Sequence, residues 1–264
     1  MMLLRFLTVA ALTLSTTGAI FAAAIDPADE PPPPRAAPVV KVMEEALPRP
    51  GGILVFGGAD GAGLDVVGSL AKSGEKITVM VARDADIAAV KALNADVVVG
   101  DVLNRDDVAK AFAAAPFREV LAALDGAGRD VSVNYEGVRN IIDTAKAVGV
   151  PRMVLVSAIG AGDSAVAAPW FVKAFRKIYF DEKTKAENYL RASGLEYSIV
   201  RIGALLDDTP SGHAVLISDP TKFSRISKSD LTTLLVTCLK SDTNLNKVLT
   251  AFDESHDHFW DVLF

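Results

Sequence analysis

The sequence is poor in the residues on which disulfide-bonded and zinc-binding proteins depend. Of 264 residues, one is cysteine (Cys238), three are histidine and 7% are aromatic. A single cysteine excludes an intrachain disulfide, and no spacing of Cys or His predicts a closed zinc site. The HxH sequence His256-Asp257-His258 offers two ligands, which is fewer than a metal site needs. We therefore expect no metal.

Positive charge is also scarce. Lys and Arg number 27 against 33 Asp and Glu, which gives a net charge of −6. A surface that binds nucleic acid needs an excess of bases, so we expect no nucleic-acid partner and instead a small-molecule substrate. With 50% hydrophobic and 23% charged residues, the composition excludes a disordered, collagen-like or multi-span membrane chain.

The first 24 residues differ from the rest of the chain. Residues 1–5 carry one charged side chain, Arg5, residues 6–24 carry none, and Ala22-Ala23-Ala24 precedes a cleavage point before Ile25. This order predicts a secretory signal peptide and an exported protein, either periplasmic or otherwise extracytoplasmic. The alternative is an uncleaved anchor that attaches the protein to a membrane through residues 6–24. The apolar segment is diluted by polar and small residues, which favours cleavage: Thr13, Ser15, Thr16, Thr17 and Gly18.

A tether follows this segment. Residues 25–50 hold 8 of the 13 prolines and cannot bury a core, so we interpret them as an extended linker. The remaining residues, 51–264, suit one domain.

Short aliphatic runs alternate with amphipathic stretches through this domain. We expect strands at 53–56, 77–81, 97–99, 120–124 and 153–156, and helices at 61–73, 87–93, 108–114 and 133–148. Continuous apolar strands that alternate with helices predict an α/β fold with a doubly wound parallel sheet, the Rossmann fold.

A glycine-rich turn follows the first expected strand. Its glycines are Gly57, Gly58, Gly61 and Gly63. Glycine lets the backbone approach a diphosphate at a helix N-terminus, so this turn predicts a dinucleotide-binding site. Asp60 would repel phosphates, and we expect it to cap the helix and point away.

The ends of the next two strands favour one coenzyme. Arg83 stands where a cation suits the 2′-phosphate of NADP(H), and no acid immediately precedes it to bind the ribose of NAD(H), so NADP(H) is favoured over NAD(H). Asp101, followed by Val102, stands where a carboxylate could read the adenine amino group. Asp101 could equally cap a turn.

A tyrosine and a lysine then stand at helical spacing. Tyr179 and Lys183 lie four residues apart, on one helix face, after Ser157 has ended the fifth strand. A nearby cation lowers the pKa of a phenol, which would let Tyr179 exchange a proton with a carbonyl or hydroxyl. The alternative for Tyr179 is a packed helix residue.

These motifs resemble the short-chain dehydrogenase/reductase superfamily over about residues 51–205. The turn glycines match its GxxxGxG pattern, and Tyr179, Lys183 and Glu187 match the YxxxKxxxE pattern of its extended branch. The stretch from 183 to 203 is similar to the atypical NAD(P)H-binding group that includes NmrA-like proteins and flavin or biliverdin reductases.

The resemblance implies roles for individual residues. Tyr179 would exchange the proton, Lys183 would hold the nicotinamide ribose and tune Tyr179, and Ser157 would bond the substrate oxygen. Asn134, in a stretch like the family's NxxG, would support a proton relay or only fix the fourth helix. The sequence departs from the family at 124–128, where Leu-Asp-Gly-Ala-Gly replaces NNAG.

The rest of the chain is short. From about residue 204 we expect strands near 214–217 and 248–252 and a helix at 228–240, which together form a small C-terminal lid over the cleft. Trp170 and Phe171 are candidate substrate walls, although core packing is the more common role of such residues.

Two functional classes follow from these observations. The first is an NADP(H)-dependent oxidoreductase that moves hydride to or from a small carbonyl, quinone or flavin-like substrate. The second is a non-catalytic NAD(P)H-binding redox sensor or assembly factor, and an isomerase or epimerase is a third option. Export conflicts with a coenzyme made inside cells, and the start has no twin-arginine pair. An anchor with the domain on a coenzyme-rich side, another use for the cleft of an exported domain, or a misassigned start codon would each resolve this conflict. Import into an organelle is a further alternative for the localisation.

Overall fold

Helices and strands alternate along the chain in the computed structural model, which describes residues 50–126, 130–207 and 209–256. These residues belong to the compact unit formed by residues 36–264. The expected signal peptide or anchor of residues 1–24, all but the last residue of the expected linker, and Asp257 and His258 of the HxH sequence lie outside the described residues.

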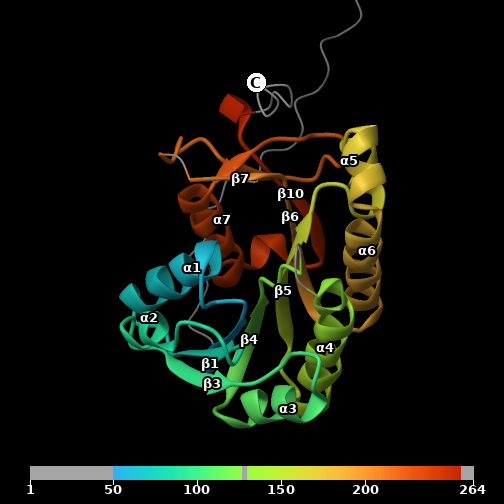
Figure 1. Cartoon of the computed structure of the whole chain (residues 1–264). Helices are drawn as coiled ribbons and strands as arrows, with labels where there is room; N and C mark the ends of the chain where they lie inside the picture. Colours follow the sequence, from blue (N-terminus) through green and yellow to red (C-terminus); the bar gives the residue numbers. More distant parts are fainter. Residues whose placement is uncertain (1–49, 127–129, 208, 257–264) are drawn as a thin grey trace, which may run out of the picture. The chain divides into compact units, whose positions relative to one another are not determined.

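One mostly parallel sheet forms the centre of the unit (Figure 1). Its strand order is β3-β2-β1-β4-β5-β6-β10-β8, and every pairing is parallel except that of β10 with β8. The strands are β1 (Gly52–Phe56), β2 (Ile77–Val81), β3 (Asp96–Val99), β4 (Phe117–Ala122), β5 (Arg152–Ala158), β6 (Glu196–Ile202), β8 (Val215–Ile217) and β10 (Lys247–Phe252). The predicted doubly wound sheet is confirmed.

Helices cover both faces of this sheet because successive side chains of a strand point to opposite faces. Ile53 and Val55 of β1 pack into one core with α1 (Gly61–Lys72), α2 (Ile87–Lys91) and α7 (Lys228–Lys240). Leu54 and Phe56 pack into a second core with α3 (Arg105–Ala113), α4 (Glu136–Val148) and α6 (Lys177–Ala192). The alternation within β1 therefore explains why its residues are hydrophobic without a break.

Most of the C-terminal segment belongs either to the sheet or to helix α7, which covers one face of the sheet. Strand β10 pairs with β6 and β8 pairs with β10, while α7 packs against α1. Outside the main sheet, β7 (Leu205–Leu206) and β9 (Ile226–Ser227) form a two-stranded sheet above its carboxyl edge (Figure 1). The lid expected from residue 204 is therefore smaller than predicted, because an apolar strand is better buried beside β6 than in a cover.

The arginine of a buried ion pair links the end of α7 to the sheet. Arg152 of β5 lies 2.9 Å from the Glu119 carboxylate of β4, and both side chains are buried. Arg152 also donates to the backbone oxygens of Cys238 and Ser241, at the end of α7. A buried charge needs such partners, so the end of α7 is fixed to the amino ends of β4 and β5.

None of the helices that the structure describes combines the length and the hydropathy of a bilayer-spanning helix. Within the described ranges, no group of three His, Cys, Asp or Glu side chains is arranged to hold a metal ion.

Candidate functional site

The turn after β1 lies where the strand order of the sheet reverses. β1 pairs with β2 on one side and with β4 on the other, and ligands of doubly wound sheets bind in the crevice at this switch point. Gly57 has φ +82°, and a Cβ there would lie against the backbone oxygen of Ala123, just beyond β4. A Cβ on Gly63 would collide with the backbone oxygen of Gly57. Only glycine fits this tight turn at both positions.

The N-terminus of α1 has no side-chain cap among the described residues. Asp60 occupies the N-cap position but forms no cap hydrogen bond, so the expectation that it caps the helix is wrong. Gly61, the first residue of the helix, has φ +49°. The first turn contains no acidic residue, and a Cβ on Gly61 would have open space around it. The uncapped amides and the open space fit an anion such as a diphosphate.

Gly58, the remaining glycine of the turn, plays a packing role. It is buried, and a Cβ there would press on the Val55 and Val79 side chains at 2.8 and 3.0 Å. It therefore lets the turn lie close to the sheet.

The candidate residues at the ends of β2 and β3 are exposed. Arg83 follows β2 and lies near Asp107. The pKa of Asp107 is lowered mainly by a hydrogen bond from Lys110 and by one from the Asp101 amide, and the charge of Arg83 adds to this shift. Asp101 accepts a hydrogen bond from the Leu103 amide at 2.9 Å. One oxygen of Asp101 thus caps a turn, as one of the two interpretations expected, and its contact with adenine stays a prediction.

Val102, at the same edge of the sheet, contacts α4 through both its backbone and its side chain. Its carbonyl oxygen accepts a hydrogen bond from Asn140 of α4 at 3.0 Å, and its side chain lies beside Gly137. The half-buried valine thus joins the end of β3 to α4.

The loop after β4 is held by Asn134. This residue lies in the 3₁₀ helix η2 (Val131–Asn134), is fully buried, and accepts a hydrogen bond from the Gly126 amide at 3.3 Å through Oδ1. Its Nδ2 has no hydrogen-bond partner among the described residues. Asn134 thus anchors the loop that carries Asp125, while its part in a proton relay stays a prediction.

Tyr179 and Lys183 lie on α6, beside the ends of β4 and β5. The Lys183 ammonium is buried and donates to the carbonyl oxygens of Leu124, at 2.7 Å, and Val156, at 3.3 Å. Its Nζ lies 5.7 Å from the centre of the Tyr179 ring. The structure thus brings the predicted pair together with the loop after β4, as the i, i+4 spacing requires.

The surroundings shift the pKa values of both groups. Burial raises the pKa of Tyr179 above its usual range, and the charge and hydrogen bond of Asp125 act in the same direction. Burial lowers the pKa of Lys183 to about 8, although the charges of Asp125 and Glu187 oppose this shift. The phenol of Tyr179 therefore keeps its proton at neutral pH, contrary to the expected lowering of its pKa.

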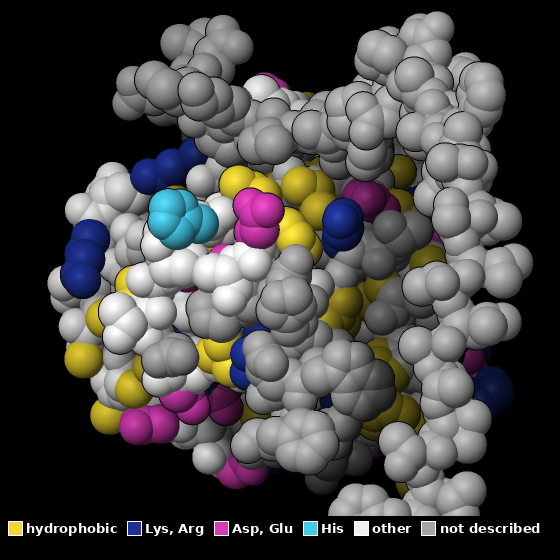
Figure 2. Space-filling view, turned by 90° about the horizontal axis from the view of Figure 1, so that it is seen from above, with side chains coloured by type: hydrophobic (Ala, Val, Ile, Leu, Met, Phe, Trp, Pro, Cys, Tyr) yellow, Lys and Arg dark blue, Asp and Glu magenta, His cyan; other side chains and the backbone are white. Residues whose placement is uncertain are grey.

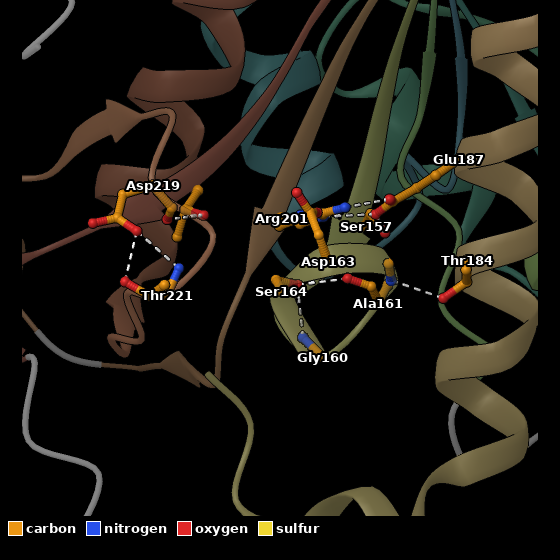
Figure 3. A network of polar contacts seen from close by, with 12 residues as sticks. Ser157, Gly160, Ala161, Asp163, Ser164, Thr184, Glu187, Arg201, Asp219 and Thr221 are labelled. Atoms are coloured by element: carbon orange, nitrogen blue, oxygen red, sulfur yellow. Dashed lines mark hydrogen bonds and ion pairs between the residues drawn. The ribbon is translucent and has the colours of Figure 1, made fainter. Parts of the chain in front are cut away.

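Ser157 is part of a buried network of hydrogen bonds (Figure 3). Its hydroxyl donates to Glu187 Oε1 at 2.6 Å, and Arg201 of β6 binds the same carboxylate through two nitrogens, at 2.9 and 2.6 Å. Arg201 also pairs with Asp163 at 2.5 Å. The Ser157 hydroxyl thus donates its proton to Glu187, and its contact with a substrate oxygen stays a prediction.

In a second glycine turn, after β5, side chains accept the hydrogen bonds of the backbone amides (Figure 3). The Gly160 amide donates to Ser164 Oγ at 3.0 Å, and the Gly162 amide donates to Thr184 Oγ1 at 2.8 Å. Ser164 in turn donates to the Ala161 carbonyl oxygen. These amides are therefore not open to a ligand.

The candidate substrate walls differ from each other. Trp170 is 78% exposed at the start of α5 (Trp170–Phe175), whereas Phe171 is half-buried, and the two rings meet edge to face. Core packing, the alternative for both, is therefore wrong for Trp170. Figure 2 looks down on this edge of the molecule, where exposed hydrophobic side chains lie beside basic and acidic ones.

Sequence reasoning missed two residues of this region. Asp125 was noted only as part of a departure from the family motif, yet it is the acidic neighbour of Tyr179. Arg201 stands inside the apolar run Ile199–Ile202, and a buried cation requires a buried anion. That rule, applied to Arg201 and Glu187, would have found the pair.

Comparison with known proteins identifies the family. A model of the NAD(P)H-binding family matches residues 57–242. The chain is 32% identical to an uncharacterized chloroplastic protein of Arabidopsis thaliana over 105 residues, which is 38% of this chain and 37% of that protein. It is 32% identical to sanguinarine reductase of Eschscholzia californica over 126 residues, which is 46% and 44% of the two chains. The matches span less than half the length of these relatives.

Among solved structures, the anaerobillin reductase ChuY from Escherichia coli O157:H7 aligns with a TM-score of 0.69 and 25% identity. The alignment covers 76% of this chain and 97% of that one. The family match includes the turn after β1, α6 and all of α7. The chain belongs to the NAD(P)H-binding family, as the resemblance of its motifs predicted.

Proposed function

We propose that this protein is an NADP(H)-dependent oxidoreductase that reduces a small carbonyl, quinone or flavin-like substrate. The observation that carries the proposal is the position of a protonated, half-buried Tyr179 and a buried Lys183 on α6, next to the loop after β4. This loop adjoins the glycine turn after β1 through Gly57 and Ala123.

The residues at the switch point fit the coenzyme. The uncapped amides of α1 and the open space at Gly61 suit its diphosphate. The exposed Arg83 at the end of β2 suits the 2′-phosphate that distinguishes NADP(H) from NAD(H). When bound, the coenzyme supplies or accepts the hydride.

Tyr179 supplies the proton. The phenol is protonated at neutral pH and can donate to a substrate oxygen as negative charge develops there, although its raised pKa makes it a weaker acid than a free tyrosine. Lys183 lies near the ring and stabilises the phenolate that results, while Asp125 holds the hydroxyl beforehand. A protonated tyrosine favours reduction over oxidation, and two of the similar proteins are reductases by name.

A second candidate function has an observation of its own. The Lys183 ammonium donates to two backbone oxygens, which leaves it fewer N–H groups for a ribose or a phenolate. A lysine bound in this way favours the alternative of a coenzyme-binding sensor or assembly factor without turnover.

Removal of the Tyr179 hydroxyl distinguishes the two candidate functions. In the enzyme, Tyr179→Phe removes the proton donor and lowers turnover by about 10²- to 10⁴-fold, while the affinity for NADPH stays unchanged. Turnover is measured as NADPH oxidation with a panel of carbonyl, quinone and flavin substrates. Tyr189→Phe is the matched control, because Tyr189 also bonds a carboxylate, Asp143, at 2.6 Å, but stands ten residues after Tyr179 on α6. NADPH binding without turnover of any substrate by the parent protein would favour the sensor, and equal turnover of the two variants would show that Tyr179 is not the proton donor.

The choice of coenzyme has a separate test. Arg83→Ser should weaken NADPH binding by about tenfold and leave NADH binding unchanged, because the 2′-phosphate loses one charge-assisted hydrogen bond. Binding is measured by titration of the protein's effect on coenzyme fluorescence. An equal loss for both coenzymes would remove the argument for NADP(H).

A further inference from the structure

Helix α5 is apolar and has no buried residue. Five of its six residues, Trp-Phe-Val-Lys-Ala-Phe, are hydrophobic. Of the large hydrophobic side chains that the structure describes, the four most exposed are Val166, Trp170, Phe175 and Ile178, at 67–89% exposure. All four lie on α5 or next to it, at the upper margin of the molecule in Figure 1. A cluster of this kind marks an interaction surface rather than a core.

The same segment is basic within an acidic protein. Residues 164–180, which we call the docking segment, contain Lys173, Arg176 and Lys177 but no Asp or Glu, whereas the whole chain carries a net charge of −6. Lys177 pairs with Asp181 at 2.5 Å, just beyond the segment, and Arg176 lies 5.4 Å from the centre of the Tyr179 ring. Exposed aromatic side chains therefore alternate with cations on one short stretch of backbone.

We propose that the docking segment binds the surface of an anionic membrane. Tryptophan and phenylalanine partition into the interface between headgroups and acyl chains, and each nearby Lys or Arg adds attraction to anionic lipids. Both components are present in residues 170–178, and the short α5 would lie in the plane of the interface.

Two other occupants fit the observations less well. A second copy of the chain on a two-fold axis would bring the same patch against itself and set its cations against one another. A small-molecule pocket would enclose the side chains that line it, whereas Phe175 is 89% exposed. An anionic surface satisfies both the apolar and the cationic side chains.

Membrane docking has a consequence for substrate access. Tyr179 directly follows Ile178 in the docking segment, so docking would bring its site to the bilayer surface, within reach of substrates dissolved in lipid. This consequence rests on the proposed function, whereas the docking itself does not.

The binding test uses the full chain and vesicles. One set of vesicles contains phosphatidylcholine with phosphatidylserine, and the other contains phosphatidylcholine alone. We expect co-flotation with the first set, weakened by salt, and a blue shift of Trp170 fluorescence in a Trp260→Phe background that leaves one tryptophan. The double variant Phe175→Ser/Lys173→Glu should bind at least about tenfold more weakly, because one anchor is lost and one charge is reversed.

A matched control keeps the result specific. Val148→Ser/Lys146→Glu changes an exposed apolar residue and an exposed lysine two positions apart, at the end of α4, and should bind as the parent does. All variants share residues 1–24, so a contribution of that segment cancels in the comparison. Unchanged melting temperature and NADPH affinity would show that both variants are folded, independently of turnover.

Three outcomes would overturn the proposal. The full chain could fail to bind the anionic vesicles, or the α5 double variant could bind as tightly as its α4 control. Alternatively, sedimentation could show a self-association that the α5 variant abolishes while vesicle binding persists, which would assign the patch to a second copy.

Discussion

Two glycine turns lie at the carboxyl edge of the same sheet, and they use their amides in opposite ways. The turn after β1 leads into α1 without a side-chain cap among the described residues, and open space surrounds Gly61. The turn after β5 gives its amides to Ser164 and Thr184, and the Arg201–Glu187 pair lies beside it. Both turns contain glycines at positive φ, so their sequences look alike.

This difference shows that a glycine-rich sequence alone does not predict a ligand-binding turn. Glycine permits a backbone conformation, but the neighbouring side chains decide whether the amides are available to a ligand. After the first glycine turn, the first turn of α1 contains no acid and no described side chain caps its amides. At the second, hydroxyls from the loop and from α6 accept the hydrogen bonds. We therefore expect substitutions to impair coenzyme binding at the first turn and stability at the second.

The largest expected effect is at the second turn. Arg201→Met removes one partner of a buried ion pair and leaves the Glu187 carboxylate uncompensated, so the free energy of unfolding should fall by about 3–5 kcal/mol. The measurement is urea-induced unfolding, combined with NADPH titration of the folded protein, whose affinity should not change.

Asp163→Asn is its control. Asp163 pairs with the same guanidinium but is 71% exposed, and solvent screening keeps such a pair below about 1 kcal/mol. If Arg201→Met weakened coenzyme binding while the unfolding free energy stayed constant, the contrast between the turns would be wrong.

Lys183 connects the two regions, because it binds the oxygens of Leu124 beyond β4 and Val156 on β5. Its pKa in the folded protein is about 8, below its ordinary value of 10.5, so the unfolded chain binds more protons between these values. Stability should therefore rise with pH from about 8 to 10.5, by on the order of 3 kcal/mol. Unfolding of Lys183→Met, followed over the same range, should lack this rise. An identical pH dependence in the variant would show that Lys183 is not the group that titrates.

The smallest expected effect is at the first turn. Gly61→Asp places a carboxylate in the open space before α1, where it would repel a diphosphate, whereas Gly61→Asn has nearly the same shape without the charge. NADPH should bind about fivefold more weakly to Gly61→Asp than to Gly61→Asn, since repulsion between two like charges close together in water costs roughly 1 kcal/mol. Titration of both variants isolates the charge from the backbone strain, and equal affinities would place the diphosphate elsewhere.

The core of the fold was predictable because local patterns agree with the sheet. Continuous apolar runs marked β1 and β2, and the predicted helix at 228–240 coincides with α7, whose N-cap Ser227 accepts from the Asp230 amide. The fourth strand was misplaced, since 120–124 was expected and β4 spans Phe117–Ala122. Its polar start belongs to the sheet because Arg118 and Glu119 find partners on other strands and loops. Such long-range pairing cannot be read from local sequence.

The candidate site was predictable only in its outline. The positions of Tyr179 and Lys183 followed from helical spacing, but the direction of the Tyr179 pKa shift did not, because it depends on burial and on Asp125 from a distant loop. Ser157 was assigned to substrate on resemblance, whereas its hydroxyl is bonded to Glu187. Which groups share a buried network is a property of packing, and single-residue motifs do not contain it.

The place of β10 has a bearing on synthesis. This strand, Lys247–Phe252, lies inside the sheet between β6 and β8, and α7 just before it packs against α1, the first helix of the described residues. While the ribosome is still producing residues 247–252, β6 has no neighbour on one side and the first helix lacks its cover. Until these residues have been made, the sheet therefore lacks an inner strand, and the pairing of distant segments that completes it must come late in folding.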